Sequence, residues 1–328
     1  MAVPPVLQNL RLPLIGSPLF IISGPELVIA QCKAGIVGSF PALNARPGPV
    51  LHEWLDRITT ELAEHNEKNP DRPAAPFAVN QIVHKSNDRL EHDVEACVKY
   101  KVPLVITSLG AQKAVNDAIH SYGGVVMHDV IDTFFAKKAL EKGADGLIAV
   151  CTGAGGHAGR LSPFALIQEI REFFDGPLAL SGSIANGGAI AASIAMGADF
   201  AYMGSAFIAC DEANAVEGYK DAIVSYGAED IVYSNLFTGV HGNYLKPSIV
   251  NAGMDPDNLP EGDKSSMKFG SGGSSKSKAW RDIWGAGQGV GSIAAVTSTA
   301  EAVSQLEREY HDAQARLARI TQPFGSKA

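Results

Sequence analysis

The chain has 328 residues, of which 46% are hydrophobic and 19% are charged, a composition that suits a globular protein with one large core. Its formal net charge of -8 gives no general electrostatic attraction to nucleic acid or to an anionic membrane. The first residues lack the ordered regions of a signal peptide, and no apolar run reaches about 18 residues, so we expect a cytoplasmic protein. The four cysteines form no C-x-x-C pair, which argues against a disulfide framework and a zinc site.

Short apolar runs recur along the chain, with amphipathic stretches between them. The runs lie at residues 12–15, 35–40, 76–83, 103–108, 125–130, 146–151, 177–181 and 200–204. Intervening segments such as 129–142 and 163–174 carry apolar residues at helical spacing, which is typical of strands and helices that alternate in a parallel sheet. Eight such units predict an α/β fold of the TIM type, a closed (β/α)₈ barrel. An open doubly wound sheet is the alternative, but no early strand is followed by its G-x-G-x-x-G fingerprint.

The periodicity fades after the eighth run. Residues 251–278 are rich in Gly, Ser, Pro, Asp and Lys, which predicts a loop or lid. Residues 298–320 return to helical spacing and are expected to pack back on the barrel. We therefore assign residues 1–228 and 284–328 to the barrel, and residues 229–283 to an insertion or a small lid subdomain.

Two glycine-containing loops follow the seventh and eighth predicted strands. The first holds Ser181, Gly182 and Ser183 before a helix that should begin near residue 189, and the second holds Gly204 and Ser205. Glycines let the backbone approach a ligand closely, and unpaired amides at the start of a helix attract phosphate. A tight turn would explain either loop alone. The pair, on one face of a barrel, predicts a phosphate-binding cup.

The loop after the sixth strand places a histidine among residues that have almost no side chain. His157 follows Gly155 and Gly156, and Ala158 and Gly159 come after it. Its position at the end of a strand predicts that the imidazole projects into open space beside a bound ring. The alternative is a surface histidine in a flexible loop.

These motifs resemble those of the nitronate monooxygenases, formerly called 2-nitropropane dioxygenases, and of the related FMN-dependent enoyl-acyl-carrier-protein reductases. The most specific match is G-G-H-A-G at residues 155–159. The sequence S-G-S-I-A-N-G at 181–187 is similar to the family's A-G-G-I-A-D-G, and M-G-S-A-F at 203–207 is similar to its M-G-T-x-F. Weaker matches at 17–19, 76–80 and 284–288 extend the likeness over nearly the whole chain.

The resemblance implies FMN as the cofactor and no metal. The residues that it implies for cofactor binding are Ser17, Pro18, Leu19, Asn80, His128, Gly155, Gly156, Ser181, Gly182, Ser183, Gly204, Ser205 and Gln288. Leu19 stands where the family usually has methionine. His128 and Asp129 stand where some relatives place a lysine near the flavin, so His128 or another group is expected to compensate. Candidates for the substrate side, with structural roles as the alternative, are His241, Tyr244 and Lys246.

The resemblance also implies a reaction. An alkyl nitronate gives an electron to FMN, and O₂ completes the conversion to a carbonyl compound and nitrite. His157 is then the catalytic residue, which orients or neutralises the anionic nitro group or accepts a carbon-bound proton from a neutral nitroalkane. An FMN reductase that passes electrons from NAD(P)H to quinones or enoyl thioesters is the alternative, and a non-catalytic flavin or phosphate sensor is a third.

The expected partners follow from that reaction. They are a small anionic nitronate and O₂, with neither nucleic acid nor membrane among them. A homodimer is a possible assembly.

Overall fold

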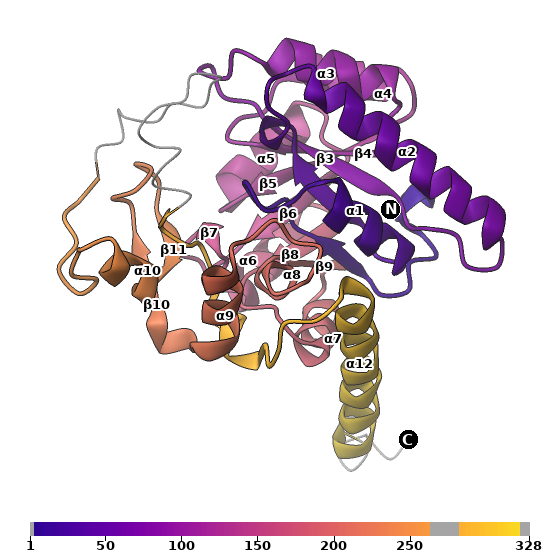
Figure 1. The fold of residues 1–328 in the computed structure, drawn as a ribbon. Coiled ribbons are helices and arrows are strands. Elements are labelled where there is room, and N and C mark those ends of the chain that lie inside the picture. Colours follow the sequence, from indigo (N-terminus) through magenta and orange to yellow (C-terminus); the bar gives the residue numbers. More distant parts are fainter. Residues whose placement is uncertain (1–2, 263–281, 322–328) are drawn as a thin grey trace.

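Eight parallel strands form a barrel in the computed structural model, which describes residues 3–262 and 282–321 (Figure 1). The strands are β1 (Leu14–Gly16), β2 (Gly38–Pro41), β3 (Phe77–Ile82), β4 (Leu104–Ser108), β5 (Val125–Val130), β6 (Gly146–Val150), β8 (Leu178–Ser181) and β9 (Phe200–Met203). They lie in the order β1-β9-β8-β6-β5-β4-β3-β2. The two edges meet where Gly16 N donates to Val37 O at 2.8 Å and Val37 N donates to Leu14 O at 3.2 Å. The predicted barrel is confirmed.

The strands are short apolar runs because both of their faces are buried, as expected for a parallel sheet that helices cover. Side chains such as Ile15, Ile106 and Met127 point inward and form one core cluster inside the barrel. Leu7, from a short 3-10 helix near the N-terminus, belongs to the same cluster and covers the amino ends of the strands. The inside of the barrel is therefore packed by side chains of the strands.

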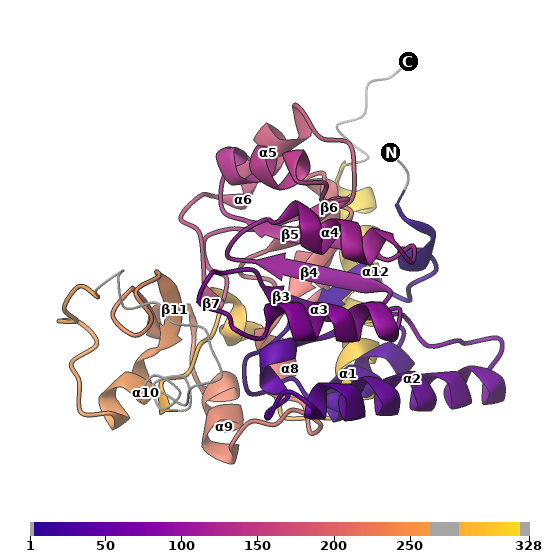
Figure 2. The ribbon, with the colours of Figure 1, turned by 90° about the horizontal axis from the view of Figure 1, so that it is seen from above.

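Helices cover the outside of the barrel (Figure 2). They are α1 (Pro25–Lys33), α2 (Val50–Lys68), α3 (Leu90–Lys99), α4 (Lys113–His120), α5 (Thr133–Glu141), α6 (Pro163–Arg171), α7 (Gly187–Ala195), α8 (Ser205–Ile208), α9 (Glu217–Ser225) and α12 (Thr299–Thr321). A further helix, α10 (Lys246–Asn251), packs on a second, smaller sheet and not on the barrel. The helices predicted within 129–142, 163–174 and 298–320 correspond to α5, α6 and α12. None of the described helices is long and apolar enough to cross a membrane.

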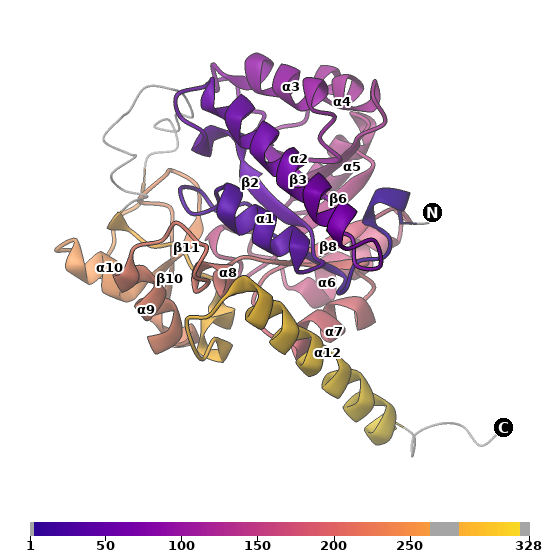
Figure 3. The ribbon, with the colours of Figure 1, turned by 45° about the vertical axis from the view of Figure 1, so that its right-hand side comes forward.

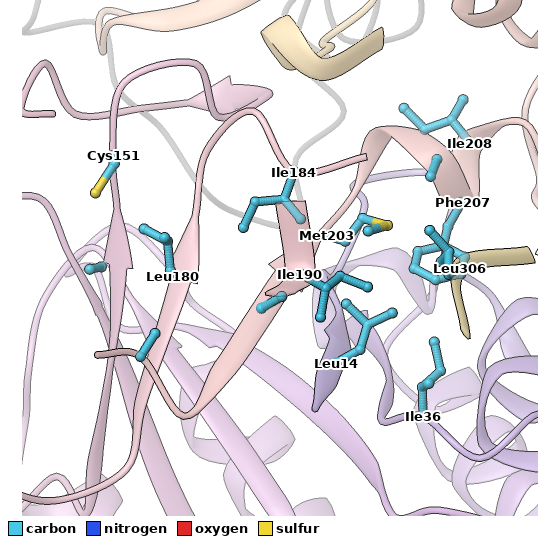
Figure 4. Packing of buried hydrophobic residues seen from close by; sticks show 14 of the residues in the cluster. Leu14, Ile36, Cys151, Leu180, Ile184, Ile190, Met203, Phe207, Ile208 and Leu306 are labelled. Carbon is cyan, nitrogen blue, oxygen red and sulfur yellow. The ribbon is translucent and has the colours of Figure 1, made fainter. Parts of the chain in front are cut away.

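The C-terminal helix α12 packs on α7, and its far end extends away from the barrel (Figure 3). Leu306 of α12 and Ile190 of α7 belong to the core cluster that also contains Leu14 and Met203 of the barrel (Figure 4). Arg11 strengthens this attachment, because its guanidinium donates to Glu307 Oε2 at 2.7 Å. The first part of α12 is therefore fixed against α7, the helix that connects the two strands, β8 and β9, that carry the glycine-containing loops.

A second, three-stranded antiparallel sheet lies beside the barrel (Figure 1). It consists of β10 (Ile231–Ser234), β11 (Gly242–Leu245) and β7 (Gly156–His157), in that order. Its third strand comes from the loop after β6, so a segment inside the predicted insertion pairs directly with the predicted catalytic loop. The assignment of 229–283 as a separate lid remains a prediction. The predicted loop at 251–278 follows α10 as turns up to residue 262, and its remainder lies outside the described residues.

The register of β5 places His128 outside the barrel. Met127 points into the interior cluster, whereas Val126 belongs to a cluster on the helix side, and successive side chains of a strand point to opposite faces. His128 is buried on the helix side, where its Nδ1 lies 2.6 Å from Thr107 Oγ1. This placement contradicts the expectation that His128 contributes to a cofactor site, and Asp129 occupies the inward position instead.

We predict that His128 makes the protein sensitive to acid. Burial lowers the pKa of His128 to about 4, whereas a histidine in the unfolded chain has a pKa of about 6.5. The unfolded chain therefore binds the proton first, and the free energy of unfolding falls as the pH drops from about 7 toward 4. Between about pH 7 and pH 5 this residue should account for a loss of about 2 kcal/mol.

Urea denaturation at the two pH values measures this loss, and His128→Gln should lose correspondingly less than the unmodified protein. His311→Gln serves as the matched control, because His311 is exposed on α12. Equal acid losses in all three proteins would contradict the assignment.

Candidate active site

A cavity of about 270 Å³ lies at the carboxyl ends of the strands. It is lined by twelve of the residues that the sequence assigned to cofactor or catalysis, namely Ser17, Pro18, Leu19, Asn80, Gly155, Gly156, His157, Ser181, Gly182, Ser183, Gly204 and Ser205. Two predicted residues are not among those that line it. His128 faces the helices, and the Gln288 side chain is exposed while its backbone N–H donates to Gly153 O at 2.9 Å.

The loops after β8 and β9 present backbone amides to the cavity. Ile184, Ala185 and Gly204 line it, and their amides donate no hydrogen bond to any described residue. Gly182 has φ +136° and Ser183 has φ +56°, so the first loop turns sharply through conformations that L residues rarely adopt. Amides arranged in this way form a concave surface that is suited to an anion.

The first helical turn of α7 does not belong to this anion site. Gly187 N donates to Glu309 Oε2 of α12 at 2.8 Å, and Ala189 N donates to the Asn186 side chain at 2.8 Å. The expectation that this helix would offer unpaired amides was wrong, because a carboxylate from the far end of the chain already satisfies one of them. Two of the three amides in the first turn of α7 are therefore occupied.

Glycines allow two distant backbone segments to touch at the wall of the cavity. A Cβ atom on Gly155 would lie 2.8 Å from Gly287 N, and one on Gly287 would lie 2.7 Å from Gly153 O. Gly287 N also donates to Ser205 Oγ at 2.9 Å. The segment around Gly287 therefore joins the loop after β6 to the loop after β9.

His157 lies on the wall of the cavity, in the strand β7. The sequence had placed this residue on a loop. Gly156 and His157 pair with Asn243 and Gly242 of β11. The imidazole is half-buried, and its Nε2 lies 2.9 Å from Thr238 Oγ1. Burial lowers the pKa of His157 to about 4, so the imidazole is neutral at neutral pH.

The predicted substrate-side residues near β11 have structural contacts. Tyr244 is fully buried and packs against Phe237 at a ring-centroid distance of 4.9 Å. His241 stacks on Tyr233 at 5.0 Å, and Lys246 forms an ion pair with Asp257 at 3.6 Å. None of these three residues is among the described residues that line the cavity. They support the small sheet that holds His157.

A hydrogen-bonded row of polar side chains crosses three neighbouring strands on the other side of the cavity. Asn80 Nδ2 donates to Ser108 Oγ at 2.7 Å, and Ser108 Oγ donates to Asp129 Oδ2 at 2.6 Å. All three residues line the cavity. Sequence reasoning assigned Asn80 to the site, noted Asp129 at the end of its strand but assigned the role to its neighbour His128, and missed Ser108. Ser108 and Asp129 each follow an inward-facing residue, Ile106 or Met127, by two positions and lie near the end of their strands. The alternation of side chains along a strand could therefore have identified both.

The loop after β1 is held in a strained conformation. Ile21 has φ +69°, which is unusual for a β-branched residue. The Asn44 side chain accepts a hydrogen bond from Ile21 N at 2.9 Å and donates to Leu19 O and Ser23 O at 3.0 and 2.9 Å. Asn44 thus fixes the backbone that carries the predicted residues Ser17 to Leu19.

Two tyrosines that the sequence did not single out also line the cavity. Tyr202 lies in β9, and Tyr219 lies in α9. The ring of Tyr219 stacks on Trp284 with a centroid distance of 5.1 Å and an angle of 8°, and its hydroxyl donates to Gly285 O. Burial raises the pKa of Tyr219 and that of Tyr202, so both phenols are neutral at neutral pH.

This combination of a barrel, an amide-lined cavity and a histidine strand agrees with a comparison of the chain with known families. The family profile described as "Nitronate monooxygenase" matches residues 59–309. The chain belongs to the nitronate monooxygenase family. A nitronate monooxygenase of Paraburkholderia phytofirmans is 26% identical over 343 residues, which cover 90% of this chain and 92% of that protein.

Solved structures share the fold of this family member. A nitroalkane oxidase from Streptomyces ansochromogenes aligns with a TM-score of 0.80 at 22% identity and covers 95% of this chain and 99% of its own. FabK from Thermotoga maritima aligns with a TM-score of 0.74 at 20% identity and covers 96% of this chain and 97% of its own. At these identities the likeness concerns the fold alone.

We predict that Gly155→Ala disrupts the contact between the two glycine segments. The new methyl group would overlap the backbone at Gly287, which cannot move aside as a flexible side chain does. Overpacking of this kind should lower the free energy of unfolding by roughly 1–3 kcal/mol. Gly218→Ala is the control, because the nearest atom to its Cβ, in the ring of Trp284, lies at an ordinary 3.5 Å. Urea denaturation compares the two variants, and equal stabilities would contradict the prediction.

Proposed function

We propose that this protein binds FMN and oxidises alkyl nitronates with O₂ to carbonyl compounds and nitrite. The observation that supports this most directly is the composition of the cavity wall. The amides of Ile184, Ala185 and Gly204, which have no acceptor among the described residues, lie on one side, and the neutral imidazole of His157 lies on another. Membership of the nitronate monooxygenase family and the name of the Paraburkholderia phytofirmans relative support the same reaction.

The residues present fit a flavin mononucleotide. The amides of the loops after β8 and β9 would hold the phosphate, since backbone N–H groups in a concave loop are suited to an anion. Glycine and serine backbones at 153–156 and 17–18 leave room for a flat ring, and Asn80 offers a polar side chain for its edge. When bound, FMN would supply an acceptor for electrons from the nitronate and a donor to O₂.

His157 is suited to orient an anionic nitro group. Its Nε2 lies 2.9 Å from Thr238 Oγ1, and that hydroxyl also lies 3.0 Å from Val240 O. When the single hydroxyl hydrogen goes to Val240 O, the imidazole must donate through Nε2, which fixes its tautomer. A histidine with a pKa near 4 is a weak base at neutral pH, so the geometry favours preformed nitronates over neutral nitroalkanes.

We predict that the purified protein is yellow, that it releases FMN and not FAD, and that the phosphate dominates its affinity for the flavin. Two charge-assisted hydrogen bonds of about 1.5–3 kcal/mol each correspond to roughly 10²–10⁴-fold in binding. The apoprotein should therefore bind riboflavin more weakly than FMN by that factor, as measured by quenching of flavin fluorescence. Equal affinities for the two would show that the loops hold no phosphate.

We predict that propionate 3-nitronate reduces the bound flavin under anaerobic conditions and that NADH does not. The decrease of the visible flavin absorbance in a stopped-flow instrument measures both reactions. Reduction by NADH alone would support the alternative, an NAD(P)H-dependent reductase for quinones or enoyl thioesters. Reduction by neither would leave the nitronate proposal without its first step and overturn it.

The same assay tests the role of His157. His157→Ala should retain the flavin and reduce the rate with the nitronate by roughly 10²–10³-fold, the usual effect of removing one positioned donor to an anion. His157→Gln keeps a donor and should recover part of the rate. A larger loss for a neutral nitroalkane than for its nitronate would assign a base role to His157. Unchanged rates with both substrates would exclude the residue from the reaction.

A further inference from the structure

Asp129 is an unusual member of this cavity wall. It is the one carboxylate among the described residues that line the cavity, and neither lysine nor arginine occurs among them. The proposed reaction places negative charge in this space, first on the nitronate and then on the reduced cofactor. An ionised carboxylate beside either would oppose it.

The structure holds Asp129 in a fixed position. Its Oδ2 accepts from Ser108 Oγ at 2.6 Å, and Ser108 is itself fixed by Asn80. A second hydrogen bond comes from the backbone of Leu109, whose φ of +61° is strained for a leucine. Side chains and backbone from β3, β4 and the turn after β4 therefore keep this carboxyl on the cavity wall. Strained backbone of this kind is more common at functional sites than elsewhere.

The titratable side chains of Tyr202 and His157 line the same cavity as Asp129, and both are neutral near neutral pH. Tyr202 of β9 faces Asp129, and the carboxylate adds to the burial that keeps this phenol neutral. His157 of β7 lines the same cavity and is neutral because of burial. Burial raises the pKa of Asp129 to about 6, while Ser108 and Leu109 pull it down. With this pKa Asp129 is mostly ionised at neutral pH, and one added negative charge nearby would raise its pKa further.

We propose that Asp129 takes up a proton from solvent whenever the cavity gains a negative charge, and so neutralises that charge in place of a fixed cation. This inference rests on the FMN part of the proposed function. The balance is simple. A flavin that accepts two electrons and one proton gains one negative charge, and the Asp129 carboxylate binds a second proton and becomes a neutral carboxylic acid. That proton returns to solvent when the electrons leave for O₂.

The experiment measures the reduction potential of the flavin-loaded protein as a function of pH, because the slope gives the number of protons taken up per two electrons. Between about pH 7.5 and 8.5 the unmodified protein should take up about two protons per two electrons, and Asp129→Asn about one. Asp132→Asn is the matched control, since Asp132 is half-buried at the start of α5, where its side chain accepts from Phe135 N, and does not line the cavity. It should behave as the unmodified protein does.

A second variant keeps the test decisive if Asp129→Asn retains no flavin. Ser108→Ala removes a hydrogen bond that favours the ionised carboxylate, so it should move the pH-dependent change of the flavin absorbance to higher pH. The proposal would be overturned if the absorbance of Ser108→Ala changed at the same pH as that of the unmodified protein. It would also be overturned if Asp129→Asn took up two protons per two electrons. Absence of flavin from the unmodified protein would instead overturn the proposed function, so the two failures are distinguishable.

Discussion

Contact between two glycine-rich backbones is the constraint on which the site depends. The loop after β6 and the segment around Gly287 approach so closely that a single methyl group at Gly155 would overlap the facing backbone. This approach brings the segment around Gly287 against the barrel, and Ser205 connects that segment to the loop after β9. Interiors packed at this density respond to small changes as whole units. The wall of the cavity is thus one connected structure, although its parts lie far apart in the sequence.

The small antiparallel sheet extends this connection to His157. Because β7 pairs with β11, the position of the imidazole depends on the backbone of a segment that follows the barrel strands in sequence. Thr238, which lies in the connection between β10 and β11, contacts Nε2 directly. Residues around 231–245 therefore support the cavity wall at His157 even where their side chains do not reach the cavity. A histidine held by strand pairing has a more defined orientation than one on an open loop.

The described cavity wall carries its positive potential on backbone amide dipoles and not on cationic side chains. The chain carries a net charge of -8, and no cation lines the described cavity wall. Amides of the loops after β8 and β9 offer partial positive charge without ions, which is the usual way to hold a phosphate in a barrel of this kind. On the opposite side, Asn80, Ser108 and Asp129 form a row in which the carboxyl can gain or lose a proton. The two sides differ in function because one supplies donors and the other supplies an acceptor.

The sequence by itself determined the barrel and twelve of the residues that line the cavity. Alternating apolar runs and helices predicted the strands, since burial of both faces of a parallel sheet requires such runs. Strand ends rich in glycine and serine identified the loops at 181–183 and 204–205, because all strand ends of a barrel meet on one face. What the tertiary structure decided was the direction of individual side chains and the partners of individual amides.

Two residues show why the sequence could not decide these points. A shift of one residue in strand register exchanges the inside for the outside, and local sequence does not fix that register, so His128 was expected in the cavity where Asp129 lies. The start of α7 looked open to phosphate, yet Glu309, more than a hundred residues later, bonds to its first amide. Pairing of β7 with β11 is likewise a contact between distant segments. Such contacts depend on how the whole chain packs, and only the three-dimensional structure contains that information.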